Sequence, residues 1–376
     1  MIMLKIQEFI LTHDNWRELL STTPYNLKIS EDDGFVLFKY NQIASDFREE
    51  ICKEARGLIL DAQDNYRVVR YAFRKFFNID EEYADKMDWN TAVASEKIDG
   101  SIMSVWFARG QWHLSTNGTI DAFKAELSGA FPYKTFGDLF ESVLPLSRFD
   151  EFSNALAHQC YTFELVSPYN KVVIDYPETK VYLLSVRDMR TLVEHNLDQV
   201  EEFSNRFGFT MPQRYDLNNE EDYRELVDSM PEGHEGVVVR DADGRRVKIK
   251  TLLYFQMHKA KNNGVITLER IVDLIRSNDH HEFLSYFPEY QSMFNKVKQK
   301  LDNLDVIVEK VRQDVGEWFH QYGQNAPRKW FAMDFGKHRY AALYFAEYDG
   351  KLDSFIDGLT TAKLIGLLHL KEEFDG

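Results

Sequence analysis

The sequence has little cysteine, no long apolar run and a deficit of positive charge. Its two cysteines, Cys52 and Cys160, are too few for a disulfide framework or for a zinc site built from four thiolates. No apolar run reaches the ~18 residues of a membrane-spanning helix, and the first residues lack the charged-then-apolar pattern of a signal peptide. We therefore expect a cytoplasmic protein with no membrane partner.

Acidic residues outnumber basic ones, 61 to 45, which gives a formal charge of −16 and a pI near 5.2. A broad nucleic-acid-binding surface depends on lysine and arginine, so the overall charge argues against one. The 44% hydrophobic and 28% charged residues are typical of globular proteins and exclude a disordered chain. With 376 residues, the chain is long enough for about two or three domains.

Alternation of polar and apolar residues predicts strands in much of the first 260 residues. Segments with this period of two fall at 35–40, 102–107, 161–165, 181–186, 236–240 and 246–250. The last two segments flank an Asp-Gly turn and form a predicted hairpin, while residues 120–158 read as mostly helical. No strand alternates regularly with a crossover helix, so we predict an antiparallel-rich α+β fold.

A different pattern begins after about residue 262. Apolar and aromatic residues then recur at alternating steps of three and four, at Phe294, Val297, Leu301, Leu304, Val308, Val311, Val315, Trp318 and Tyr322. This spacing predicts a long amphipathic helix. The stripe suits a coiled-coil dimer or an all-α domain, and the lack of regular flanking charge pairs favours the domain. We therefore divide the chain into residues 1–260 and a smaller all-helical domain, residues 261–376.

The segment Glu96-Lys97-Ile98-Asp99-Gly100-Ser101 is the first candidate for covalent chemistry. It places the amine of Lys97 at a strand end or tight turn, just before an apolar strand. A lysine amine becomes an effective nucleophile when burial or neighbouring cations favour its uncharged form. Standing alone, however, so short a string is better explained as a surface turn.

Other charged residues supply what phosphate chemistry needs besides an amine. Four basic residues lie beside apolar anchors: Arg56, Lys75, Lys248 and Lys250. The last two share one face of a strand, although a solvent-facing hairpin edge would show the same pattern. Two carboxylates, Glu164 and Glu235, stand within apolar strands, where an ionised group is costly unless it is paired or metal-bound. A structural salt bridge or an exposed strand face is the alternative for each.

Taken in order, these residues form a set: Arg56, Lys75, Lys97-x-Asp99-Gly100, Glu164, Glu235-Gly236 and Lys248-x-Lys250. The set resembles the covalent nucleotidyltransferases, that is, ATP-dependent ligases and capping guanylyltransferases. It most closely resembles the tRNA-repairing RNA ligases of T-even bacteriophages, the first phage RNA ligase family. The resemblance covers residues 35–260 and implies an antiparallel-rich nucleotidyltransferase domain followed by an all-α C-terminal domain, which we take as an RNA-specificity module.

The resemblance implies a ligation reaction in three steps. Lys97 attacks the α-phosphorus of ATP and becomes lysyl-N-AMP, AMP passes to an RNA 5′-phosphate, and a 3′-hydroxyl then seals the strand. The resemblance implies that Lys248 and Lys250 bind the α-phosphate and that Arg56 and Lys75 bind the triphosphate. It implies that Tyr40 contacts the nucleotide and Glu164 the ribose. Glu235 matches a carboxylate needed near the metal or the lysine, and Asp99 and Gly100 shape the nucleophile's loop. Tyr254 is either a nucleotide or RNA contact or a core tyrosine.

The resemblance also implies ATP, a divalent ion and RNA as partners. The ion is Mg²⁺, with Mn²⁺ as a substitute, and Asp279 is its candidate ligand, although a solvated loop suits this acidic segment better. The RNA is expected to present single-stranded ends or a cleaved tRNA anticodon loop. We also expect a polynucleotide kinase or phosphatase to act upstream of the protein. The protein itself is expected to be a monomer in the cytoplasm of a host cell.

Two segments depart from the family's pattern, and other functions stay open. Residues 115–119 carry no charge where the phage enzyme is lysine-rich, and Lys171 stands where an arginine is expected. A DNA ligase or capping guanylyltransferase would share the core, but these usually carry an OB-type barrel where residues 262–376 read as helix. The remaining alternative is a non-catalytic RNA-binding protein with a transferase-like core. Against it, every charged position of the set holds a residue that is competent for the chemistry.

Overall fold

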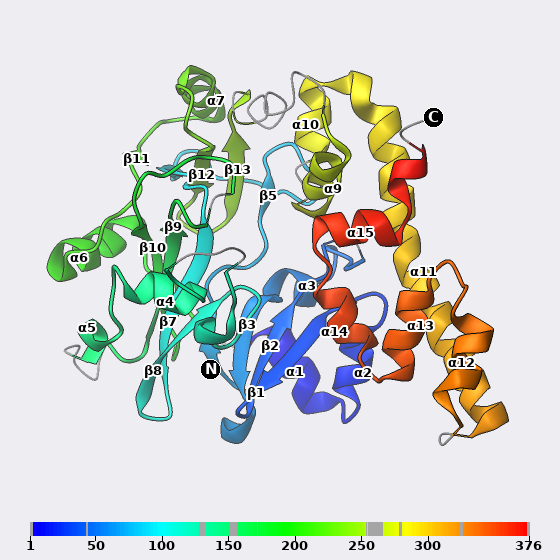
Figure 1. Cartoon of the computed structure of the whole chain (residues 1–376). Coiled ribbons are helices and arrows are strands. Elements are labelled where there is room, and N and C mark those ends of the chain that lie inside the picture. The colour runs from blue at the N-terminus through cyan, green and yellow to red at the C-terminus, as the bar shows by residue number, and fades with distance from the viewer. Residues whose placement is uncertain are drawn as a thin grey trace. The chain divides into compact units, whose positions relative to one another are not determined.

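A computed structural model describes residues 3–42, 44–127, 132–150, 156–170, 172–252, 254, 266–277, 280–323 and 326–373. The chain divides into two compact units, Met1–His258 and Lys259–Gly376. Within the described residues, all strands belong to the first unit, whereas the second contains only helices and short 3-10 turns (Figure 1). The predicted fold class, antiparallel-rich α+β followed by a helical C-terminal part, is confirmed.

The first sheet is antiparallel and has the order β1-β2-β3-β4. Its strands are β1 Lys28–Asp32, β2 Phe35–Lys39, β3 Arg56–Asp61 and β4 Arg67–Arg70. Asp33 and Gly34 make the β1–β2 turn with positive φ, a conformation that glycine adopts without strain. Apolar residues of β2 and β3 are buried against three helices, α1 Lys5–Thr12, α2 Trp16–Ser21 and α3 Glu50–Glu54.

The second sheet has the order β10-β9-β7-β8 and is also antiparallel. Its strands are β7 Ser101–Ala108, β8 Gln111–Thr116, β9 Gln159–Val166 and β10 Lys180–Asp188. β9 is buried at every position because strands flank it on both sides and helices pack on the sheet. These helices are α4 Phe136–Glu141, α5 Ser147–Asp150 and α6 Leu197–Phe207.

The prediction that residues 120–158 are mostly helical is wrong. The described part of this stretch holds only α4, α5 and a 3-10 turn at Ala122–Lys124. Glu126 and Thr135 form an isolated antiparallel bridge, and Pro132 between them cannot donate a helical hydrogen bond. Apolar side chains of the stretch 120–158 pack individually into the core of the second sheet and do not form a helical stripe.

The third sheet has the order β11-β6-β12-β13-β5. Its strands are β5 Phe77–Asn78, β6 Val93–Glu96, β11 Arg214–Tyr215, β12 Gly236–Arg240 and β13 Arg246–Lys250. Only β13 and β5 pair in parallel among the described strands, and α7 Glu220–Ser229 packs against the apolar face of the sheet. The predicted hairpin is confirmed, and its register sets Lys250 opposite Gly236.

The second unit contains α9 Leu268–Ser277, α10 His280–Tyr286, α11 Gln291–Tyr322, α12 Arg328–Phe335, α13 Ala341–Tyr348, α14 Leu352–Asp357 and α15 Thr361–Leu367. The predicted long helix is confirmed as α11. Its stripe is buried inside the unit, where Val311, Val315 and Trp318 pack with Phe331 of α12 and Leu343 of α13. The interpretation as one helix of an all-α domain is therefore confirmed. No described helix is both long and apolar enough to cross a membrane.

Candidate active site

Lys97 lies among charged side chains that the third sheet contributes. It follows β6 directly, and its backbone N–H donates to the carbonyl of Gly236 at 2.8 Å. Its Nζ lies 2.7 Å from Glu235 Oε2, and Lys250 Nζ lies 3.1 Å from Oε1 of the same carboxylate. Two lysines therefore share one glutamate at the point where the β12–β13 hairpin meets the end of β6.

The three side chains differ in exposure. Those of Glu235 and Lys250 are each 3% exposed, whereas that of Lys97 is 23% exposed. Two lysines beside one carboxylate in a poorly solvated place form a site where an anionic ligand could be held. The amine of Lys97 is the member of the group that a substrate can reach.

A second group of cations surrounds Tyr40, which follows β2. Lys75 Nζ lies 5.2 Å from the centre of the Tyr40 ring, and the Lys75 residue is only 6% exposed. Burial acts to raise the pKa of the Tyr40 hydroxyl, but Lys75, Arg56 and Lys248 together outweigh it, and the pKa is lowered. This positive surrounding is what a phosphate chain requires.

Glu164, on β9, interacts with the charges of the same site, including those of Lys97 and Arg56. The residue is 7% exposed, and the described part of the chain offers its carboxylate no hydrogen bond or ion pair. Burial raises the pKa of Glu164 to about 8, against the opposing effects of Lys97 and Arg56. A buried acceptor without a partner is costly, so a ligand hydroxyl in hydrogen-bond reach would stabilise it.

Asp99 fastens the loop that follows Lys97. Its Oδ2 accepts the backbone N–H groups of Val173 and Ile174 at 2.8 and 2.7 Å, and its Oδ1 accepts the hydroxyl of Tyr254 at 3.1 Å. Tyr254 is 4% exposed, so the structure places it in the interior, with its hydroxyl holding Asp99. At Gly100 a Cβ would clash with the backbone carbonyl of Leu165 and would lie 2.9 Å from a side-chain carbon of Val166, so the chain approaches β9 closely at this glycine.

The two lysines of β13 are buried, which overturns the alternative of a solvent-facing hairpin edge. Lys248 is 8% and Lys250 3% exposed. Likewise, Glu164 does not lie on an exposed strand face. Of the residues named from the sequence, Asp279 and Lys171 lie outside the described residues. In the described part of the chain, no group of three or more His, Cys, Asp or Glu side chains could hold a metal ion.

Sequence reasoning missed a buried ionic network around Glu194. Its carboxylate is bonded to Arg246, lies 2.7 Å from Arg187 and lies 3.5 Å from Arg240. The Arg246 guanidinium also lies 4.9 Å from the centre of the Phe73 ring. A charged residue within an apolar strand sequence is the feature by which Glu164 was predicted. The arginines of this network show the same feature and could have been found by it. A further missed residue, Arg70, is completely buried.

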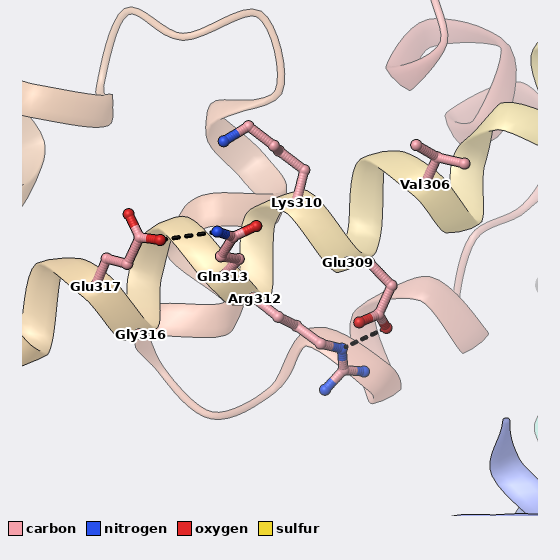
Figure 2. Close-up of a pocket in the computed structure, with 7 residues that line it drawn as sticks. All are labelled: Val306, Glu309, Lys310, Arg312, Gln313, Gly316 and Glu317. Atoms are coloured by element: carbon pink, nitrogen blue, oxygen red, sulfur yellow. Dashed lines mark hydrogen bonds and ion pairs between the residues drawn. The ribbon is translucent and has the colours of Figure 1, made fainter.

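A shallow hollow on α11 in the second unit shows no comparable chemistry. Its lining residues are Val306, Glu309, Lys310, Arg312, Gln313, Gly316 and Glu317. Figure 2 shows two pairs along the helix: Gln313 donates to Glu317 at 2.8 Å, and Arg312 lies 3.6 Å from Glu309. These are neighbours on successive turns of one helix, so the hollow is an ordinary polar helix surface.

A family model described as RNA ligase matches residues 54–264, which is more than half of the chain. The chain belongs to the RNA ligase family. The matched segment includes Lys97, Glu164, Glu235 and the lysine pair of β13.

Individual relatives of this RNA ligase family member are distant. A protein of Autographa californica nuclear polyhedrosis virus, named provisionally as a bifunctional polynucleotide kinase/RNA ligase, is 26% identical over 309 residues, which cover 76% of this chain and 42% of the viral protein. The RNA ligase of Rhodothermus phage RM378 is 25% identical over 382 residues, covering 84% of this chain and 85% of that protein. An archaeal ATP-dependent RNA ligase structure has a TM-score of 0.46 and 14% identity, with 82% of each chain covered. The chain thus spans less than half of the viral relative.

Proposed function

We propose that this RNA ligase family member joins an RNA 5′-phosphate to a 3′-hydroxyl in an ATP-dependent reaction through lysyl-N-AMP at Lys97. The observation that carries the proposal is a reachable lysine amine 2.7 Å from a buried glutamate that a second lysine shares. An amine that attacks phosphorus needs an acceptor for its proton and positive charge around the phosphate. Glu235 offers the first and Lys250 the second.

In the first step, Nζ of Lys97 attacks the α-phosphorus of ATP. The N–P bond forms as the bond to the β-phosphate oxygen breaks, and pyrophosphate leaves. Glu235 lies within hydrogen-bond reach of Nζ and accepts the proton that the amine loses. Lys250, and Lys248 two residues before it in β13, offset the charge that grows on the α-phosphate oxygens.

The remaining residues bind the rest of the nucleotide in this proposal. The cations Arg56 and Lys75 hold the phosphates beside Tyr40, and Glu164 accepts a ribose hydroxyl. A divalent ion, Mg²⁺ or Mn²⁺, would supply further positive charge to stabilise the phosphates during transfer. Asp279 stays the predicted ligand, since such an ion keeps several waters and needs only one or two carboxylates of the protein.

In the later steps, AMP passes from Lys97 to an RNA 5′-phosphate, and a 3′-hydroxyl attacks that activated end and releases AMP. We propose a role in RNA repair, with tRNA as a candidate substrate. The name of the viral relative joins a polynucleotide kinase to an RNA ligase. Because a kinase produces the 5′-phosphate that a ligase consumes, we propose an upstream kinase as a partner. We also propose that the protein works as a monomer.

We further propose that α12 of the second unit contacts the RNA. Trp330 and Met333 are 49% and 73% exposed on this helix, and the ring of Tyr322 lies 6.2 Å from that of Trp330. Lys329 and Lys337 are exposed close by in the sequence. Unpaired bases stack on aromatic rings while lysines attract the backbone phosphates, so this face suits single-stranded RNA.

The nucleophile is tested by incubating the protein with α-³²P-labelled ATP and Mg²⁺, followed by a denaturing gel. We expect covalent label on the wild type and none on Lys97→Ala. Lys124→Ala is the matched control, because that lysine is 60% exposed and pairs with Asp32 at the surface. An unlabelled wild type would overturn the enzyme proposal, label on Lys97→Ala would overturn the nucleophile, and label from GTP in place of ATP would favour a capping enzyme.

A further inference from the structure

Arg70, the last residue of β4, is a buried cation that no carboxylate neutralises within the described residues. It is 0% exposed. Its guanidinium donates to Ser104 Oγ at 3.1 Å, to Asn117 Oδ1 at 2.8 Å, to the carbonyl of Arg56 at 3.3 Å and to that of Gly57. Burial lowers the pKa of Arg70 to about 10. All the hydrogen-bond partners of Arg70 are neutral groups. The buried arginines Arg187, Arg240 and Arg246 differ in this respect, because the carboxylate of Glu194 neutralises part of their charge.

The partners of Arg70 come from three separate elements. The carbonyls belong to the start of β3, Ser104 belongs to β7, and Asn117 belongs to the turn after β8. At Gly57, which has a φ of 74°, a Cβ would clash with the guanidinium and would lie 2.8 Å from the carbonyl oxygen of Asn117. The start of β3 and this turn are therefore packed directly against each other around Arg70.

Arg56 is the residue whose backbone this arrangement fixes. Its guanidinium lies 4.8 Å from the centre of the Phe76 ring and 5.7 Å from that of Phe73. Its charge also reaches Tyr40 and Glu164. A long side chain binds phosphate efficiently only if its backbone is held, since otherwise ordering the chain offsets the binding energy.

We infer that Arg70 is a positioning residue, which holds the start of β3 against the Asn117 turn so that Arg56 meets the phosphate chain of ATP. The inference rests on the proposed function for the role of Arg56. A planar guanidinium with donors in fixed directions can bind four acceptors at once, whereas an ammonium group cannot reproduce that geometry. The charge of Arg70 is tolerated there because neutral acceptors from three elements bind its donors.

The two halves of the reaction separate this role from a merely structural one. Self-labelling of Lys97 uses the triphosphate, but sealing of RNA that already carries a 5′-adenylate does not. Loss of general structure would slow both reactions to a similar extent. Loss of Arg56 positioning would weaken ATP use while sealing of the adenylylated RNA persists.

The experiment compares Arg70→Lys with Arg67→Lys in the full chain. Arg67 lies on the same strand, but it is 46% exposed and pairs with Asp64 at 2.5 Å. For Arg70→Lys we expect at least a tenfold rise in the KM for ATP in self-labelling, with sealing of adenylylated RNA within about threefold of wild type. Arg67→Lys should match the wild type in both reactions. Equal losses in both reactions, or an unchanged KM, would overturn the inference.

A second variant keeps the test valid if Arg70→Lys does not fold. Asn117→Ala removes one acceptor while leaving the charge of Arg70 in place, and we expect a smaller rise in the same KM. Inorganic tripolyphosphate supplies a readout that does not depend on ligation: it should raise the melting temperature of the wild type more than that of either variant. Stabilisation by tripolyphosphate together with an unlabelled wild type would refute the proposed function alone. Equal stabilisation of all three proteins would refute the positioning role.

Discussion

Glu164 carries a carboxylate whose ionisation opposes folding, because burial raises its pKa to about 8. Its ordinary value is 4.5, so between these pH values the unfolded chain has released a proton that the folded chain still holds. The contribution of this group to the free energy of unfolding therefore falls as pH rises through that window, by a few kcal/mol at most. The neighbouring charges of Lys97, Glu235, Arg56 and Asp99 are already part of this balance.

Glu164→Gln removes that ionisation while keeping the shape of the side chain. We expect the variant's melting temperature to gain on the wild type as pH rises from 5 to about 8, and the gain to level off above that. Circular dichroism melts across this range measure it, and Glu178→Gln, at a 66% exposed glutamate, is the control. A difference that is constant with pH would contradict the prediction. Self-labelling should weaken in the same variant without loss of fold.

Individual site residues could be predicted because charges in apolar strand sequences are conspicuous. Glu164, Glu235 and the lysine pair of β13 were selected on that ground, whereas Lys97 was selected from a Lys-x-Asp-Gly string that precedes an apolar strand. All of them lie in the first unit. The sharing of Glu235 by two lysines could not be predicted, since it depends on the register between strands distant in sequence. Arg70 escaped for the same reason, because its partners come from β3, β7 and the turn after β8.

The β12–β13 hairpin is the element on which the geometry of the lysine site depends. Gly236 begins β12 with a φ of 142°, and a Cβ there would lie 2.7 Å from Lys250 Cα and would clash with the carbonyl of Ile249. The carbonyl of Gly236 also accepts the backbone N–H of Lys97. A side chain at this position would push β13 away and separate Lys250 from Glu235.

We therefore expect Gly236→Ala to abolish self-labelling and to lower the free energy of unfolding by several kcal/mol, as overpacking and strain add. Gly244→Ala, at the tip of the same hairpin, is the control. It also has positive φ, but its Cβ would meet nothing closer than 3.9 Å, so it should cost about 1 kcal/mol and keep activity. Denaturant unfolding and labelling of both variants test this, and equal effects would contradict it.

Elements with a long regular period were predictable, and those made of isolated contacts were not. The stripe of α11 runs along a helix of 32 residues, so its period is unambiguous. The stretch 120–158 contains apolar residues too, but a single β bridge, a proline and core contacts decide its path. Such contacts join residues that no local pattern relates, and local propensity then yields to tertiary packing.

At the scale of the whole molecule, acidity is distributed while cations concentrate. The chain has a formal charge of −16, yet residues 243–262 contain six basic residues and one acidic residue. The overall charge therefore argues only against a broad basic surface, and leaves room for local phosphate binding. An enzyme of this kind should hold RNA through few phosphates, assisted by uncharged contacts such as Trp330.

This distribution predicts how RNA affinity depends on salt. If the protein neutralises about three phosphates of single-stranded RNA, its affinity should fall about 20-fold as KCl rises from 50 to 200 mM. Fluorescence anisotropy with a 5′-phosphorylated oligonucleotide measures the slope. Lys337→Gln should flatten it by about 0.7, whereas Trp330→Ala should cost about 1–3 kcal/mol of affinity and leave the slope unchanged. Lys310→Gln, on α11 and paired with Asp314 at 2.6 Å, is the control. A flat salt dependence would contradict the local phosphate grip, and wild-type affinity in both Lys337→Gln and Trp330→Ala would show that this surface serves something other than RNA.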